Sequence, residues 1–501
     1  MKPPAHPLKK VLIANRGEIA LRVIRACHAR GIPTVAVYSD ADRNGLHVRL
    51  ADEAVHIGPS APRESYLVHE KILEAARISG ANAIHPGYGF LSENAAFAAK
   101  CRDAGIVFIG PPPEAIRAMG DKIQSRLRMK AAGVPVVPGE DAVNEDTLEE
   151  AATRVGFPLM LKASAGGGGK GIRIVRTMSE LREAFERARA EAEKAFGDGT
   201  VFLERFVEGP HHVEVQVFGD HHGNIVHVFE RECSVQRRHQ KVVEESPSPF
   251  VTPDLRARMC EAAVAAARAV GYVNAGTVEF LVDARREFYF LEMNTRLQVE
   301  HPITELVTGI DLVAEQLRVA AGEPLSFRQK DIGQSGHAIE VRVCAEDPES
   351  GYLPSTGVID GLLLPGGPHV RLDSCLFPGL EISPFYDSML AKLCVWAPTR
   401  DEAAARMRQA LAEMRISGLR TNLAFLARIL RDPEFLSGAY DTGILGRMAV
   451  SAPDAETERL ALITAAVLKH EYAESAKPVA AEGRTGGMDA WRSAFRFGGG
   501  R

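Results

Sequence analysis

The segment 277–294 contains two apolar, strand-like runs, each with a glutamate. If an antiparallel hairpin turns at positions 285 and 286, Glu279 lies opposite Glu292, and Leu281 lies opposite Phe290. Two carboxylates about 5 Å apart on an otherwise apolar face destabilise a sheet unless a cation lies between them or one is protonated. The pattern therefore indicates a place that needs a positive charge.

Oxygen ligands of this kind suit Mg²⁺. Asn294, two residues after Glu292, lies on the same side of its strand and adds a neutral oxygen. The sequence thus predicts a metal site formed by Glu279, Glu292 and Asn294. A solvated sheet edge is the alternative.

The next segment, 295–302, places Arg296, Gln298, Glu300 and His301 in a short loop. A guanidinium group clamps a planar oxyanion through two parallel hydrogen bonds, and a neighbouring carboxylate can serve as a general base. We expect Arg296 to bind an oxyanion and Glu300 to act on it. An ordinary surface loop is the alternative.

A glycine-rich segment, 164–171, lies between the strand-like runs 159–162 and 172–175. A backbone without side chains can lie directly against phosphate oxygens, and Lys162 supplies a cation nearby. The segment is not a Walker A loop, because Ser164 and Gly171 stand where that motif requires Gly and Ser or Thr. It predicts a phosphate-binding hairpin, with a flexible linker as the alternative.

A basic cluster occupies residues 237–241. We interpret Lys241 and His239 as phosphate or anion ligands, against the alternative of a solvated strand. Nucleic-acid binding is not expected, because no basic residues are interleaved with aromatic ones over a broad stretch.

The elements that must position these groups begin with a doubly wound α/β domain ending near Met119. Its turn at 14–18 resembles a dinucleotide-binding turn, and Asp40 stands where such a fold places its ribose-binding acid. The turn has only one glycine, Gly17, and its neighbours Arg16 and Glu18 would crowd a pyrophosphate, so NAD binding is not favoured. The domain's expected strands are 11–14, 34–38, 83–85 and 107–109.

The whole chain of 501 residues is long enough for about three domains. Its net charge of −5 argues against a nucleic-acid coat or a polybasic membrane anchor. Seven scattered cysteines without a C-x-x-C pair indicate neither a disulfide framework nor a zinc site. No apolar stretch of about 18 residues occurs, so a cytoplasmic location is expected. The predicted divisions are 1–119, 120–335, 336–450, and a helical or linker tail at 451–501.

Taken together, these motifs resemble those of the biotin carboxylase family of the ATP-grasp superfamily. The string 292–301, Glu-Met-Asn-Thr-Arg-Leu-Gln-Val-Glu-His, is highly specific, and the order and spacing of the motifs strengthen the match. The resemblance implies an N-terminal doubly wound α/β domain, a central ATP-grasp domain with a mobile glycine-rich lid at about 135–207, and a C-terminal mixed α+β domain. The segments that carry it are 11–20, 85–94, 119–122, 164–171, 237–241, 292–301 and 421–422.

The resemblance further implies that ATP and bicarbonate form carboxyphosphate, from which CO₂ passes to biotin. In that reaction Glu300 would deprotonate bicarbonate and Arg342 would stabilise the biotin enolate. By its pattern alone, Arg342 would be an exposed strand arginine. The resemblance also implies ATP contacts by Lys122, Lys162, Gly168, Gly169 and His239, and an adenine pocket of Glu204, Arg205, Phe206 and Val207, with His212 and Leu281 among the cofactor-binding residues. It implies Mg²⁺ or Mn²⁺ at Glu279, Glu292 and Asn294. It implies bicarbonate at Lys241, Arg296, Gln298 and Val299.

No Ala-Met-Lys-Met biotinylation sequence occurs in the chain. The resemblance therefore implies a homodimer that acts on a separate biotin carboxyl carrier protein and works with a carboxyltransferase. Arg205 and Lys170 depart from residues frequent in the family, but both keep the charge. Two alternatives remain at this point: an ATP-grasp ligase that forms carbamoyl phosphate and ignores biotin, and a nucleotide-binding regulatory subunit without turnover.

Overall fold

The computed structural model describes residues 7–163, 172–196, 199–238, 240–448, 459–460, 462–467 and 469–470. The chain divides into two compact units, Met1–Arg447 and Met448–Arg501. In the second unit, residues 462–467 are helical and belong to the segment predicted as a tail helix. Within the described ranges, every helix is too short or too polar to cross a lipid bilayer.

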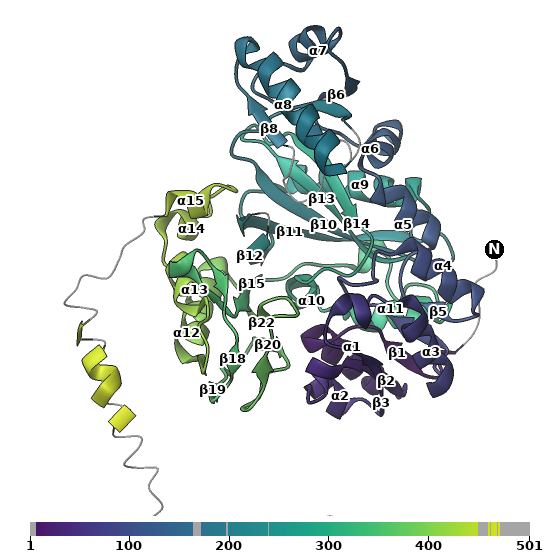
Figure 1. Cartoon of the computed structure of the whole chain (residues 1–501), viewed down its shortest axis with the longest axis vertical. Helices are drawn as coiled ribbons and strands as arrows, with labels where there is room; N and C mark the ends of the chain where they lie inside the picture. Colours follow the sequence, from purple (N-terminus) through teal and green to yellow (C-terminus); the bar gives the residue numbers. More distant parts are fainter. Residues whose placement is uncertain are drawn as a thin grey trace, which may run out of the picture. The chain divides into compact units, whose positions relative to one another are not determined.

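The N-terminal region is a parallel five-stranded sheet in the order β3-β2-β1-β4-β5, flanked by helices (Figure 1). This confirms the predicted doubly wound domain and four of its strands. The amino-acid pattern did not predict β3, an edge strand in which only Ile57 is buried and the apolar signal is therefore weak. The elements are β1 Val11–Ile13, α1 Gly17–Ala29, β2 Thr34–Ser39, α2 Leu46–Leu50, β3 Glu53–Gly58, α3 His69–Ser79, β4 Ala83–His85, α4 Ala95–Asp103, β5 Val107–Phe108 and α5 Pro113–Gly120.

The turn after β1 explains why its single glycine suffices. Gly17 has φ +66°, a left-handed conformation that suits glycine. Arg16 donates hydrogen bonds from Nε and Nη2 to Asp42 at 2.8 and 2.7 Å. The turn is therefore braced by an ion pair within the protein.

Helix α6 spans Lys122–Ala131. The segment that follows it contains a separate four-stranded antiparallel sheet in the order β6-β9-β7-β8. Its two helices bury Leu148, Leu181 and Phe185 against the strands. Strands β7 and β8 form the predicted hairpin, while the glycine-rich segment 164–171 between them lies outside the described residues. The elements are β6 Gly139–Val143, α7 Leu148–Val155, β7 Leu159–Ala163, β8 Ile172–Val175, α8 Met178–Phe196 and β9 Val201–Arg205.

The first unit also contains an eight-stranded sheet in the order β14-β13-β10-β11-β12-β15-β22-β20. Antiparallel pairing of β12 with β15 makes one sheet from segments on both sides of residue 336, the predicted start of the C-terminal division. Its strands are β10 His211–Gly219, β11 Ile225–Arg237, β12 Gln240–Ser246, β13 Asn274–Val282, β14 Phe288–Asn294, β15 His337–Cys344, β20 Val370–Ser374 and β22 Met389–Ala397.

Helices and short strands complete this unit. The helices are α9 Pro253–Ala269, α10 His301–Thr308, α11 Leu312–Ala320, α12 Arg400–Glu413, α13 Leu423–Ile429, α14 Pro433–Ser437 and α15 Ile444–Arg447, and the short strands are β16 Glu346–Asp347, β17 Leu353–Pro354, β18 Gly357–Val358, β19 Gly361–Leu363, β21 Glu381–Ile382 and β23 Arg415–Ser417.

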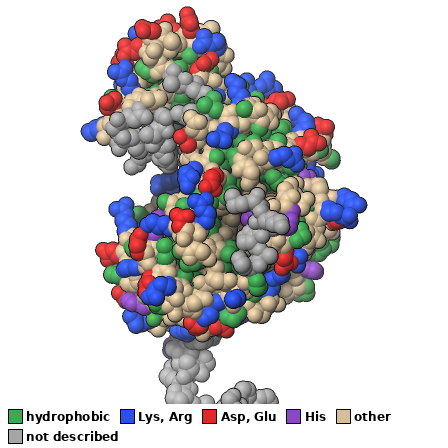
Figure 2. Space-filling model, turned by 90° about the vertical axis from the view of Figure 1, so that its right-hand side faces the viewer, with side chains coloured by type: hydrophobic (Ala, Val, Ile, Leu, Met, Phe, Trp, Pro, Cys, Tyr) green, Lys and Arg blue, Asp and Glu red, His purple; other side chains and the backbone are tan. Residues whose placement is uncertain are grey.

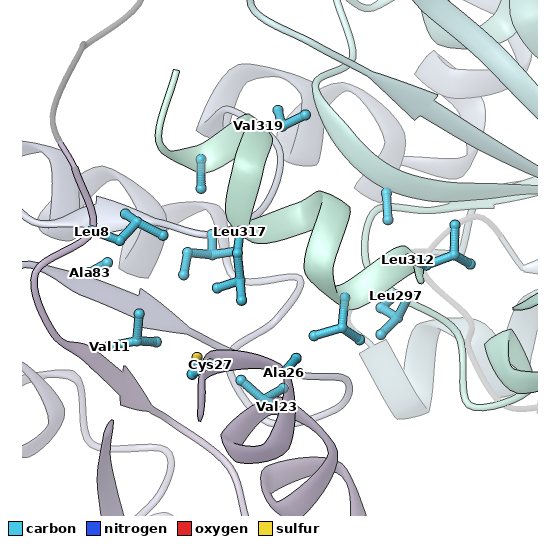
Figure 3. Close-up of a cluster of buried hydrophobic side chains, with 14 of the residues drawn as sticks. Leu8, Val11, Val23, Ala26, Cys27, Ala83, Leu297, Leu312, Leu317 and Val319 are labelled. Atoms are coloured by element: carbon cyan, nitrogen blue, oxygen red, sulfur yellow. The ribbon is translucent and has the colours of Figure 1, made fainter. Parts of the chain in front are cut away.

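A buried apolar cluster joins the N-terminal region to the eight-stranded sheet (Figure 3). Helix α1 contributes Val23 and Ala26, and helix α11 contributes Leu312 and Leu317. Leu297, between two polar residues of the predicted oxyanion loop, is fully buried in the same cluster. The loop is thus anchored by hydrophobic packing.

Basic and acidic side chains are interspersed over the described part of the face shown in Figure 2. A cluster of buried ionic groups, including Glu214, Lys241 and Glu300, lies against the eight-stranded sheet.

Glu245 links the sheet to the C-terminal helices and has no exposed side-chain surface. It receives hydrogen bonds from His337 Nε2 at 2.5 Å, Arg400 Nε at 2.8 Å and Tyr440 at 2.5 Å. Burial opposes its ionisation, but the hydrogen bonds from His337 and Arg400 prevail and lower the pKa of Glu245 to about 2.

We expect Glu245→Gln to lower the free energy of unfolding by about 1.5–3 kcal/mol near neutral pH, the cost of weakening hydrogen bonds to a charged group. Because the folded pKa is depressed, this contribution is complete above the unfolded pKa of about 4.5 and declines as pH falls toward about 2. Denaturant unfolding of both proteins at several pH values measures it. A stability difference that does not shrink below about pH 4 would contradict the assignment.

Candidate active site

The predicted hairpin is formed by β13 and β14, and Glu279 lies opposite Glu292, as expected. The next expected pair, Leu281 with Phe290, is wrong. Phe280 lies opposite Phe290, because Leu291 is an extra residue that forms a β-bulge. The five-residue turn at 283–287 shifts the register by one residue from the expected one. The bulge at Leu291 shifts it back, so Glu279 still pairs with Glu292.

A second bulge lies beside Lys241. Val235 pairs with Val243 and Gln236 pairs with Lys241, so Val242 is an extra residue in β12. Bulges redirect side chains and are common next to active sites. Here Lys241 reaches the ionic cluster around Glu300.

The ammonium group of Lys241 is shared by three carboxylates. Its Nζ lies 2.5 Å from Glu214 Oε2, 2.9 Å from Glu279 Oε1 and 2.6 Å from Glu300 Oε1. These four residues come from β12, β10, β13 and the loop before α10, and all three carboxylates are buried. One cation therefore holds together three acids from three other parts of the chain.

Burial opposes the charge of every member, and the ion pairs reverse that effect for most of them. Lys241 and His212 hold the pKa of Glu279 well below its ordinary value. Lys241 and Arg342 do the same to the pKa of Glu300, which is therefore ionised at neutral pH. The carboxylates, chiefly Glu214, raise the pKa of Lys241 well above its usual value.

Arg342, on β15, is the second cation of the site. Its Nε donates to Glu244 Oε1 at 2.6 Å, and its Nη2 donates to Glu300 Oε2 at 3.0 Å. Only 17% of its side chain is exposed, so the interpretation of Arg342 as an exposed strand arginine, drawn from pattern alone, is wrong. Arg342 and Lys241 both line a surface pocket, together with Gln240, Tyr352 and Asn422.

Behind this pair lies a fully buried arginine that the sequence reading missed. Arg231 donates to Glu214 at 2.5 Å, to Gln216 at 2.9 Å and to Thr304 at 2.8 Å. The available signal was the alternation of His212, Glu214 and Gln216 with valines along one strand, which marks a polar face.

The loop 295–300 is held by hydrogen bonds from several directions. All three nitrogens of Arg296 have protein acceptors, namely Glu93, Gln298 with the Leu297 carbonyl, and Asn294. Buried Lys392 donates to the Val299 carbonyl at 2.9 Å, and His301 Nδ1 donates to the Gln298 carbonyl at 2.8 Å. These contacts within the protein fix the position of the loop.

The donor set around Glu279 suits a divalent cation. Ligand atoms of His212, Glu214 and Glu279 lie within 4.8 Å of one another. The amide of Asn294 donates to Glu279 at 2.8 Å, and its oxygen accepts from Arg296 Nη2 at 3.0 Å, so both hydrogen bonds must break before the amide oxygen can turn toward the same region. Clustered carboxylate oxygens match the chemistry of Mg²⁺. Metal binding by Glu279, Glu292 and Asn294 remains a prediction.

The residues expected near the nucleotide lie partly in the small sheet. Lys162 on β7 forms an ion pair with Glu204 on β9, and Arg205 donates to the Tyr289 hydroxyl at 2.6 Å. Phe206 donates its backbone N–H to the Pro158 carbonyl at 2.9 Å. The structure also describes Val207, which is buried, and Leu281, which pairs with His212.

His212 joins the acidic cluster, since its Nε2 lies 2.8 Å from Glu279. Its expected place near the adenine remains a prediction. The basic cluster 237–241 divides, because Arg237 stacks on Tyr352 while Lys241 turns to the carboxylates. Gly168, Gly169, His239 and the side chain of Lys122 lie outside the described residues.

Three family profiles match the chain in succession. They are "Biotin carboxylase, N-terminal domain" at residues 7–116, "Carbamoyl-phosphate synthase L chain, ATP binding domain" at 121–328, and "Biotin carboxylase C-terminal domain" at 340–447.

The chain is 53% identical over 441 residues to a biotin carboxylase of Nostoc sp., covering 88% of this chain and 99% of that one. It is also 53% identical over 445 residues to the mitochondrial methylcrotonoyl-CoA carboxylase subunit alpha of Mus musculus, covering 88% of this chain but 62% of the relative's length.

Among solved structures, a similar one is the biotin carboxylase domain dimer of 2-oxoglutarate carboxylase from Hydrogenobacter thermophilus, crystallised with MgADP, ADP and bicarbonate. The TM-score is 0.82 with 49% sequence identity, and the match covers 88% of this chain and 98% of that one.

Proposed function

Because the chain belongs to the biotin carboxylase family, we propose that it carboxylates biotin on a separate carrier protein, using ATP and bicarbonate. The observation that best supports this proposal is the convergence of Lys241, Glu300 and Arg342, which joins an ionised base to two fixed cations. A base and a cation in one buried site suit proton removal from an oxyanion substrate followed by stabilisation of developing negative charge.

In the proposed sequence, Glu300 takes the bicarbonate proton and bicarbonate attacks the γ-phosphate of ATP. Carboxyphosphate and ADP form, and carboxyphosphate then divides into CO₂ and inorganic phosphate. The phosphate takes the proton of the biotin ring nitrogen, and that nitrogen attacks CO₂. Arg342 would stabilise the biotin enolate, and Arg296, Gln298, Val299 and Lys241 would hold bicarbonate. Glu279, Glu292 and Asn294 would hold Mg²⁺, which would neutralise negative charge on the transferring phosphoryl group.

The nucleotide would lie against the small sheet and its glycine-rich segment. We assign the phosphates to Lys122, Lys162, Gly168, Gly169 and His239. The adenine pocket is assigned to Glu204, Arg205, Phe206 and Val207, with Leu281 and His212 nearby.

The partners we propose are a biotin carboxyl carrier protein and a carboxyltransferase, with the chain itself a homodimer in the cytoplasm. The final acceptor is an acyl-CoA, and acetyl-CoA is the first to test. Methylcrotonoyl-CoA is one competing acceptor, because two relatives bear that name. Reconstitution with the native carboxyltransferase and each acyl-CoA would decide between them.

One assay tests the reaction: phosphate release with ATP, Mg²⁺ and bicarbonate, measured with and without free biotin. We expect release to require Mg²⁺ and to rise when biotin is added, and removal of the metal with EDTA should abolish it. Biotin-independent turnover at the full rate would favour a carbamoyl-phosphate-forming ligase. ATP binding without turnover would contradict the proposal.

A further inference from the structure

Two glutamates lie directly opposite each other behind Arg342. Glu244 on β12 pairs with Glu340 on β15 in the antiparallel register, and each is fully buried. Opposed side chains in such a pair lie about 5 Å apart at Cβ. Two ionised carboxylates so placed repel each other strongly in a medium of low dielectric constant.

Each carboxylate of the pair has one oxygen with a hydrogen-bond partner and one oxygen without a partner among the described residues. Glu244 Oε1 accepts from Arg342 Nε at 2.6 Å, and Glu340 Oε2 accepts from the Cys394 thiol at 3.2 Å. Within the described residues, Glu244 Oε2 and Glu340 Oε1 are buried and have no hydrogen-bond partner. Buried oxygens without partners are costly, and a proton between them would satisfy both.

We propose that Glu244 and Glu340 share a proton, and that Glu244 thereby positions Arg342 without neutralising it. In this arrangement the Oε2–H of Glu244 donates to Glu340 Oε1, while Glu244 Oε1 still accepts from Arg342. The inference deepens the proposed function and rests on it, since Arg342 is assigned there to the biotin enolate. Glu244 is a positioning residue, because it acts through Arg342.

The surrounding charges agree with a retained proton. Burial raises the pKa of Glu244 to about 7, with Glu300 adding to the effect and Arg342 opposing it. Burial likewise raises the pKa of Glu340 well above its ordinary value, although Lys392 opposes this. The charged and titratable groups facing the pair are Arg342 on β15, Glu300 in the loop, Lys241 on β12, Cys233 on β11, Lys392 and Cys394 on β22, and Tyr88 in the segment after β4.

Sharing a proton has a consequence for catalysis. Arg342 already contacts the ionised Glu300. If Glu244 were fully ionised as well, two carboxylates would offset one guanidinium, and its attraction for a developing enolate would weaken. A protonated Glu244 keeps its hydrogen bond to Arg342 without offsetting the positive charge of the guanidinium.

Three variants separate geometry from charge. Glu244→Gln copies the protonated acid, since its oxygen accepts from Arg342 and its amide donates to Glu340. Glu340→Gln removes the negative neighbour and lets Glu244 ionise at lower pH. Glu244→Leu removes the acceptor, and we expect about a 10²-fold loss in the biotin-dependent rate, as for a catalytic group displaced by about 1 Å.

The readout is the pH profile of the biotin-dependent rate. We expect the wild-type rate to fall on the alkaline side as the pair ionises. Glu244→Gln should lose that fall, and Glu340→Gln should move it to lower pH. Glu230→Gln is the matched control, because Glu230 is also buried and is held through Nε and Nη2 of Arg256, at 2.8 and 2.7 Å. Its profile should follow the wild type.

A second readout does not depend on activity. Difference infrared spectra at neutral pH should show a protonated-carboxyl band in the wild type that is lost in Glu244→Gln and in Glu340→Gln but kept in Glu230→Gln. The inference is overturned if the band persists in both Glu244→Gln and Glu340→Gln, or if the alkaline fall in rate is unchanged in Glu244→Gln. If the wild type shows no biotin-dependent rate, the proposed function fails while the infrared result still decides whether the proton is shared.

Discussion

Replacing Glu300 by Gln is expected to lower the rate of biotin carboxylation by about 10²–10⁴-fold, the contribution typical of a positioned general base. Glu300 is fully buried and is held at its two oxygens by Lys241 and Arg342. These contacts keep the carboxylate ionised and aligned. Gln has the same size but cannot take a proton from bicarbonate.

The measurement is carboxylation of free biotin, with ATP binding followed separately by calorimetry. ATP affinity should stay close to that of the wild type, because the residues assigned to the nucleotide lie elsewhere. Glu230→Gln again serves as the control for the loss of a buried, arginine-paired carboxylate. If Glu300→Gln carboxylates biotin at the wild-type rate, Glu300 is not the base.

The second large effect is expected for Lys241→Met, which removes the cation shared by Glu214, Glu279 and Glu300. Breaking a buried ion pair by deleting one partner costs about 3–5 kcal/mol. We expect at least that loss in the free energy of unfolding, because three carboxylates would then face one another, and we expect biotin carboxylation to be lost. Denaturant unfolding without metal measures the stability effect.

Lys241→Arg is the matched variant, since it keeps the charge while changing the geometry. It should recover much of the lost stability but not full activity, because a planar guanidinium cannot reproduce three contacts from one nitrogen. Addition of Mg²⁺ should stabilise Lys241→Met more than the wild type, since a cation that binds the folded protein replaces the missing charge. Equal stability of Lys241→Met and the wild type would show that the shared cation contributes little.

Where local pattern carries the information, the prediction from sequence succeeded. Apolar runs gave four of the five N-terminal strands, and the spacing of the hairpin gave the pairing of Glu279 with Glu292. The segment 292–301 predicts an oxyanion site, because an arginine, an amide and a carboxylate in one loop suit an oxyanion, and this chemistry stays a prediction. These features depend on neighbours within a few residues of each other.

The register between distant strands could not be read from the sequence. The bulges at Leu291 and Val242 shift pairing by one residue, and no local pattern marks them. For the same reason Arg342 was interpreted as exposed. Its environment is set by Glu244 and Glu300, which come from other strands and loops.

The amino-acid sequence by itself thus determined the order of the elements, the family, and most of the residues that we assign to the reaction. Only the tertiary structure decided how their charges are balanced. Glu214, Arg231, Glu244, Glu340 and Lys392 look like ordinary polar positions along their strands, and they form one buried ionic network because long-range antiparallel pairing brings their strands together. The sequence shows which side chains can ionise. Their charged partners and the dielectric constant around them are set only by the folded chain.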